Sequence, residues 1–146
     1  SDVTDEVRSV LGAEGASAVA ALPSVRDALL SRQRELAVAP GLVADGRDMG
    51  TVVFPTAPLK IFLEASALAR AQRRQSQLQL QDEDVSLPRL LEAIEARDTR
   101  DRTRSVSPLV PAQDAVVVDS TDMTADAVFD RVMSLVAKKG IVHCDD

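Results

Sequence analysis

Three short, largely apolar runs set the strongest constraint on the fold of this chain, because each of them stops at an aspartate or glutamate. They cover residues 42–44, 59–63 and 116–118. Runs without strict polar alternation are typical of strands buried on both faces, and such strands occur mainly in parallel sheets covered by helices. We therefore expect the three runs to be parallel strands of an α/β sheet.

Helices are expected before, between and after these strands. Pro23 suits the first turn of a helix, and Ser66 and Thr124 suit N-cap positions. The predicted helices cover residues 23–37, 67–81, 87–104 and 125–138, in addition to a helical beginning of the chain. The alternation of strands and helices predicts a doubly wound fold, in which ligands bind beyond the carboxyl ends of the strands.

The charge balance argues against nucleic acid as a partner. The chain has 23 aspartates and glutamates against 17 lysines and arginines, a formal net charge of −6, and it contains no Trp or Tyr for base stacking. Most of the positive residues are arginine, which favours paired hydrogen bonds to oxyanions, although a GC-rich genome would produce the same bias. No run of about 20 apolar residues predicts a membrane span, so we expect a cytoplasmic protein with no membrane partner.

Residues 97–104 form the most basic segment, with the sequence Arg-Asp-Thr-Arg-Asp-Arg-Thr-Arg. On a helix at roughly 100° per residue, Arg97, Asp101 and Arg104 fall on one face. Two guanidinium groups with a carboxylate between them suit a sugar phosphate. A solvated, salt-bridged helix surface would have the same pattern.

The loop at residues 45–50 follows the first predicted strand, where ligands of a doubly wound fold normally bind. Gly46 and Gly50 permit tight turns, and Arg47 and Asp48 supply opposite charges. The pair is a candidate site, and an ion-paired turn is the alternative.

A second basic cluster, Arg70, Arg73 and Arg74, lies on the helix after the second predicted strand. These arginines share one helical face, and the polar, glutamine-rich residues 75–84 after them are expected to be mobile and exposed. A hinged basic flap is one interpretation of this segment. An ordinary solvated helix end is the other.

Four sequence blocks, in the same order, resemble bacterial cytidylate kinase. They are Gly-Leu-Val-Ala-Asp-Gly-Arg-Asp-Met-Gly-Thr-Val-Val-Phe-Pro from residue 41, Leu-Lys-Ile-Phe-Leu-Glu-Ala-Ser from residue 59, the arginine-rich segment from residue 97, and Val-Val-Asp-Ser-Thr from residue 117. The resemblance implies transfer of the γ-phosphoryl group of ATP to CMP or dCMP. It also implies a P-loop nucleoside-monophosphate-kinase fold, with a helical monophosphate-binding insert and a short lid.

The resemblance also implies roles for individual residues. Ser17, Arg26 and Asp48 match residues that read the cytosine, Arg47 and Arg104 match ligands of the acceptor phosphate, and Arg97 and Asp101 match ribose contacts. Arg70, Arg73 and Arg74 match lid arginines that close over the transferring phosphoryl group. By the same carry-over, residues 1–40 belong to the insert, residues 41–139 to the kinase core with its lid at about 70–86, and residues 140–146 are a tail that departs from the family.

No Gly-x-x-x-x-Gly-Lys-Ser/Thr motif occurs in the 146 residues. That motif holds the phosphates of ATP and its Mg²⁺, so we expect neither to bind well here, and we expect the chain alone to be inactive. A non-catalytic CMP-binding module is the alternative.

In the family the P-loop strand lies between the strands that match residues 42–45 and 59–63. Without it, we expect an incomplete sheet that is marginal, repacked with its two orphan edges together, or completed by a missing amino-terminal segment or a second chain.

Overall fold

A computed structural model describes residues 12, 15, 16, 19, 22–80, 85–105 and 107–141. The chain divides into two compact units, Ser1–Asp45 and Gly46–Asp146. The predicted helical start before residue 12 and the tail after residue 141 lie outside the described residues.

The first unit contains helix α3, Pro23–Glu35. Pro23 occupies the first turn, where its missing N–H leaves no hydrogen bond unmade, and Arg32 and Arg34 lie in the last turn, where the helix dipole favours positive charge. The predicted helix over residues 23–37 is therefore confirmed, and it ends two residues early. None of the residues of α3 is buried.

Residues 42–44 were expected to form a strand, and this prediction is wrong for the structure described here. They have no regular secondary structure, and Val43 is 100% exposed. A strand is stabilised by backbone hydrogen bonds to a neighbouring strand, and the sheet of the described residues contains only β1 and β2. Apolar character alone did not make this segment a strand.

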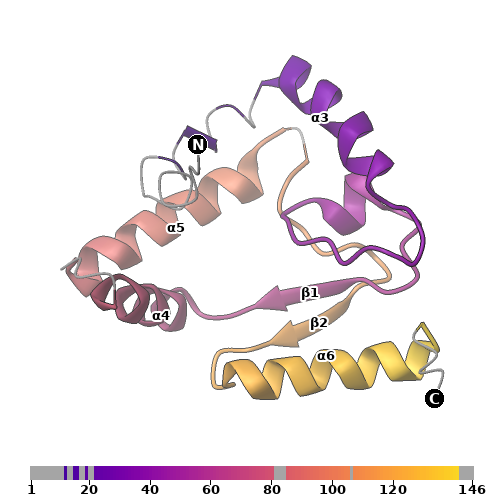
Figure 1. Cartoon of the computed structure of the whole chain (residues 1–146). Coiled ribbons are helices and arrows are strands. Elements are labelled where there is room, and N and C mark those ends of the chain that lie inside the picture. Colours follow the sequence, from indigo (N-terminus) through magenta and orange to yellow (C-terminus); the bar gives the residue numbers. More distant parts are fainter. Residues whose placement is uncertain are drawn as a thin grey trace. The chain divides into compact units, whose positions relative to one another are not determined.

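The second unit has the order η1, β1, α4, α5, β2 and α6 (Figure 1). Strand β1, Ile61–Glu64, pairs in parallel with strand β2, Val116–Asp119, and Ile61 lies opposite Val116. Both strands were expected, and both form within two residues of the predicted bounds. The connection between them carries helices α4, Ala67–Gln79, and α5, Leu87–Thr103, as a parallel strand pair requires.

The strands are not buried on both faces, contrary to the expectation from their apolar runs. Val118 is 5% exposed, whereas Leu63 and Val117 are 54% and 50% exposed. Two strands present too little sheet to be covered on both faces, so half-exposed apolar side chains remain. The doubly wound architecture is therefore present here only as a β–α–α–β unit followed by helix α6, Ala125–Lys139.

The helix caps follow the sequence closely. Ser66 and Thr124 accept hydrogen bonds from Ala69 N and Ala127 N, at 3.2 Å each, and Gly140 ends α6 in the left-handed region with a φ of 62°. Among the described residues, no helix combines the length and the apolar character needed to span a bilayer.

Helices α4 and α5 form an antiparallel hairpin with its own small core. Ala71 and Leu78 of α4 pack with Leu90 of α5. The prediction that residues 75–84 are exposed is wrong for Leu78, which is only 2% exposed, whereas residues 76, 77, 79 and 80 are exposed. Residues 75–79 continue α4. Residues 81–84 lie outside the described part of the chain.

Candidate functional site

The last two turns of α5 bring three charged residues together, as the sequence spacing predicted. Arg97 Nε lies 3.8 Å from Asp101 Oδ2, and Arg104 Nη1 lies 3.7 Å from Asp101 Oδ1. These are the i,i+4 and i,i+3 neighbours of a helix, so local geometry is sufficient to explain the pairs. The predicted shared face of Arg97, Asp101 and Arg104 is confirmed.

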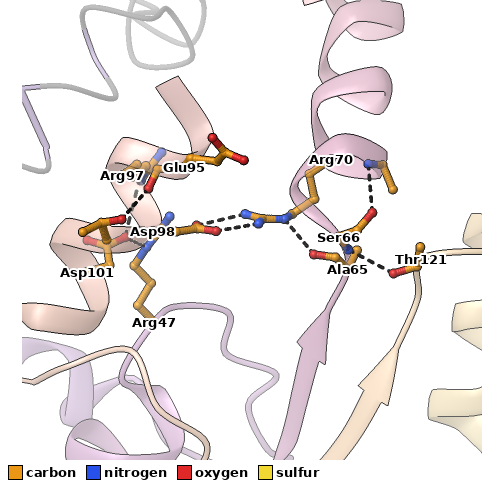
Figure 2. A network of polar contacts seen from close by, with 11 residues as sticks. Arg47, Ala65, Ser66, Arg70, Glu95, Arg97, Asp98, Asp101 and Thr121 are labelled. Carbon is orange, nitrogen blue, oxygen red and sulfur yellow. Dashed lines mark hydrogen bonds and ion pairs between the residues drawn. The ribbon is translucent and has the colours of Figure 1, made fainter. Parts of the chain in front are cut away.

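Arg47 joins the same carboxylate from a distant part of the sequence. Its Nε donates a hydrogen bond to Asp101 Oδ2 (Figure 2). Arg47 lies just before η1, Met49–Val53, a single wide helical turn in which Val52 N and Val53 N both donate to Asp48 O. Turns of this kind are frequent at functional sites, and this one places Arg47 and the buried Asp48 at the beginning of the second unit.

We call Arg47, Arg97, Asp101 and Arg104 the Asp101 cluster. The Asp101 carboxylate is 5% exposed, whereas the side chains of the three arginines are 22–38% exposed. Three guanidinium groups and one carboxylate carry a formal net charge of +2. The cluster therefore has more hydrogen-bond donors than its single carboxylate can accept, and its donors remain partly accessible.

Arg97 illustrates this excess of donors. Its Nε is buried and makes no hydrogen bond within the described part of the chain, because the distance to Asp101 is too long. Burial, and then the positive charge of Arg47, lower the pKa of Arg97 from its ordinary value. Arginine nonetheless stays protonated at neutral pH, so an anion placed here would relieve both an unsatisfied donor and a repulsion between like charges.

The chain after α5 folds back on the cluster. Arg104 Nε donates to Ser107 O, and Leu109 N donates to Asp101 O at 2.8 Å. The first bond orients the guanidinium group of Arg104, which Asp101 also contacts, and the second holds the chain after α5 against the end of the helix.

Arg70 of α4 does not belong to the Asp101 cluster but lies next to it, as Figure 2 shows. Its Nη1 and Nη2 donate to the two carboxylate oxygens of Asp98 at 2.9 and 2.5 Å, and its Nε donates to Ala65 O at 3.1 Å. The bonds from Arg70 lower the pKa of Asp98, and the same bonds raise the pKa of Arg70. Each nitrogen of this guanidinium group thus donates a hydrogen bond to an acceptor of the protein.

The other two arginines of α4 point to different partners. Arg73 donates to Ser120 Oγ and to the main-chain oxygens of the loop after β2, at Ser120, Thr121 and Met123. Arg74 Nη1 donates to Gln77 Oε1 at 3.5 Å within α4. The three arginines share a helix, but their guanidinium groups do not gather at one point.

The remaining predicted residues belong to the first unit. Arg26 is a half-buried residue of α3, and Ser17 lies outside the described residues. Asp98, in contrast, was not predicted as part of a site. The sequence does place it one turn before Asp101 on the same face, but its partner Arg70 lies 28 residues earlier, and no local pattern indicates that pair.

A comparison with protein families matches residues 1–138 to the family described as cytidylate kinase. Curated relatives named cytidylate kinase include a protein of Pseudomonas savastanoi pv. phaseolicola, 58% identical over 140 residues, and one of Pseudomonas fluorescens (strain Pf0-1), 59% identical over 140 residues. Each alignment covers 96% of this chain and 61% of the relative. A relative from Pseudomonas putida is 55% identical over 141 residues, which are 97% of this chain and 62% of that protein. The chain thus spans about 61% of the length of the curated relatives that it matches.

Proposed function

This chain belongs to the cytidylate kinase family, and from that membership we propose that it provides the acceptor-binding part of an enzyme that transfers the γ-phosphoryl group of ATP to CMP or dCMP. The Asp101 cluster is the observation that carries the proposal. The cluster has a net positive charge, accessible donors and a buried Arg97 Nε that makes no hydrogen bond among the described residues. The oxygens of a nucleotide phosphate and its sugar would supply acceptors for these donors.

Within the cluster, Arg47 and Arg104 are the proposed ligands of the acceptor phosphate, and Arg97 and Asp101 the proposed ribose contacts. Guanidinium forks match phosphate oxygens in pairs, and a carboxylate accepts hydrogen bonds from hydroxyl groups. Asp101 also keeps the arginines oriented, so the site loses little conformational entropy on binding.

Base recognition is proposed for Asp48, with Arg26 and Ser17 contributed by residues 1–40, the proposed monophosphate-binding insert. Cytosine presents one amino donor and two acceptors, so a carboxylate together with donor groups is needed to read it. Residues 41–139 form the proposed core, and α4 begins the proposed lid at about 70–86.

The lid proposal involves Arg70, Arg73 and Arg74. Arg70 and Arg73 bind protein acceptors in this structure, so a phosphate would have to replace some of those acceptors before either arginine could serve the reaction. Phosphoryl transfer leaves little covalent work to the protein, and positioned positive charge next to the acceptor supplies most of the catalysis.

ATP and Mg²⁺ are required by the proposed reaction, and we expect neither to bind well to this chain. No group of three or more His, Cys, Asp or Glu residues is arranged as a metal site in the described ranges. The 146 residues also contain no Gly-x-x-x-x-Gly-Lys-Ser/Thr motif. We expect these residues on their own to bind CMP without phosphorylating it.

Calorimetric titration of the chain with CMP, AMP and ATP tests the proposal. The Asp101 cluster, without a P-loop motif in the 146 residues, predicts that CMP binds and that ATP does not. Absence of CMP binding at millimolar concentration would refute the acceptor site. Ordinary turnover in a coupled CMP-dependent ATPase assay would refute the expected inactivity.

Two further expectations stay predictions: a cytoplasmic location, and a sheet completed by another segment or a second chain.

A further inference from the structure

Asp98 is a partly buried charged residue beside the proposed site, and the proposed reaction gives it no role. Its carboxylate is 13% exposed and binds Arg70 of α4 through two hydrogen bonds. A bidentate pair between arginine and carboxylate fixes both the distance and the orientation of the two groups. Asp98 therefore constrains two helices at once.

The position of this pair in the helical hairpin determines what it constrains. Leu78 of α4 packs near Leu90 of α5, at the end of the hairpin where the two helices are joined. Arg70 and Asp98 lie eight residues further along each helix, about 12 Å away at 1.5 Å per residue. The apolar core extends from the closed end of the hairpin as far as Ala71, next to Arg70. The ion pair between Arg70 and Asp98 adds a charged contact at the open end, beyond the last core residue of α5.

The open end carries the Asp101 cluster. The last turns of α5 after Asp98 contain Asp101 and Arg104, and the residue before it is Arg97. Arg70 also donates to Ala65 O, just beyond the end of β1. Asp98 is therefore connected through one guanidinium group to the carboxyl end of β1, so the last turns of α5 are held at a defined place beside the strand.

We infer that Asp98 is a positioning residue, which holds the last turns of α5 through Arg70 so that the Asp101 cluster is preassembled for its nucleotide. This inference rests on the proposed function for its choice of ligand. The two carboxylates have different roles. Asp101 contacts the arginines of the cluster, and Asp98 holds the helix that carries most of them.

The test uses Asp98→Asn, which keeps the size of the side chain and removes its charge. We expect amide hydrogen exchange at residues 99–105 to be about tenfold faster, because the end of α5 is released. We expect Kd for CMP to rise about fivefold, because binding must then order that end. Asp98→Glu keeps the charge and should lie closer to the wild type in both measurements.

Two control variants separate positioning from stability and from charge alone. Glu95→Gln removes an exposed charge from the same helix and should change neither quantity. Leu90→Ala loosens the closed end of the hairpin and should lower Tm, yet leave Kd for CMP within about twofold when binding is measured well below Tm. Loss of affinity in Leu90→Ala equal to that in Asp98→Asn would show a purely structural role and overturn the inference.

The route through Arg70 is tested by combining variants. In an Arg70→Gln background, Asp98→Asn should add no further change in Kd or in exchange, because the two residues act as one unit. Additive effects would overturn the inference. If the wild type fails to bind CMP, the proposed function is wrong, and the exchange measurements alone still decide whether Asp98 holds the end of α5.

Discussion

The arginines of α4 and those of the Asp101 cluster are the same residue type on neighbouring elements, yet their hydrogen-bond donors are used differently. Arg70 and Arg73 donate to a carboxylate and to main-chain oxygens that match their guanidinium groups. The three arginines of the cluster instead share one carboxylate, and Arg97 keeps a buried nitrogen without a hydrogen bond. In this structure the donors of Arg70 and Arg73 are matched by protein acceptors, whereas the cluster arginines keep donors that a ligand can use.

Asp101→Ala should have the largest effect, because it removes the acceptor that all three cluster arginines share. Losing one partner of a buried ion pair costs about 3 kcal/mol, and the partial exposure of the arginines argues for the lower end of the usual range. Urea unfolding should show this loss, and calorimetry should show no measurable CMP binding. Glu92→Ala, at an exposed position of α5, is the matched control and should change neither. Unchanged CMP affinity in Asp101→Ala would remove Asp101 from the site.

Arg73→Gln tests whether an arginine of α4 contributes to stability without contributing to CMP binding. It removes charge-assisted bonds to the loop after β2, so the free energy of unfolding should fall by about 2 kcal/mol. CMP affinity should stay within about twofold, because Arg73 lies outside the cluster. Arg89→Gln, an exposed substitution in the first turn of α5, should leave both unchanged. An Arg73→Gln variant that keeps its stability but binds CMP much more weakly would show that Arg73 serves binding instead of folding.

Arg104→Lys tests whether an arginine of the Asp101 cluster contributes to CMP binding through its guanidinium geometry, because the substitution keeps the positive charge. Lysine cannot supply two parallel hydrogen bonds to a phosphate, so Kd for CMP should rise about tenfold, equivalent to about 1.4 kcal/mol. Arg102→Lys, two residues earlier on the exposed side of α5, should bind CMP as the wild type does. Equal affinities for both variants would mean that only positive charge, and no fork geometry, matters at Arg104.

The pH dependence of stability should show the smallest of the effects expected for single residues. It measures the contribution of the charge on Asp98. Because Arg70 holds the pKa of Asp98 below its ordinary value, the charged pair stabilises the folded chain above the unfolded pKa of about 3.9. That contribution is lost as the pH falls through the lower, folded pKa. The difference in Tm between the wild type and Asp98→Asn should therefore be present at pH 7, begin to shrink below about pH 4, and vanish only below the lower, folded pKa. A difference that persists in acid would show that the charge of Asp98 is not its source.

Much of the second unit was predictable from the sequence, since its determinants are local. Ser66, Thr124 and Gly140 fix helix ends through hydrogen bonds or a backbone conformation that involve near neighbours in the chain. The shared face of Arg97, Asp101 and Arg104 likewise follows from helix periodicity alone. Local patterns therefore identified the part of the site that a single helix carries.

The contacts that complete the site could not be found in this way. Arg47 reaches Asp101 across 54 residues, and Arg70 reaches Asp98 across 28, so each pair depends on where the chain places whole elements. Residues 42–44 show that a tertiary contact can also be missing where the local pattern predicts an element. An apolar run becomes a strand only when a neighbouring strand shares backbone hydrogen bonds with it. The sequence by itself determined the helices, their caps and which charges share a face. The tertiary structure alone decided how many hydrogen-bond acceptors each guanidinium group has, since those acceptors come from distant segments of the chain.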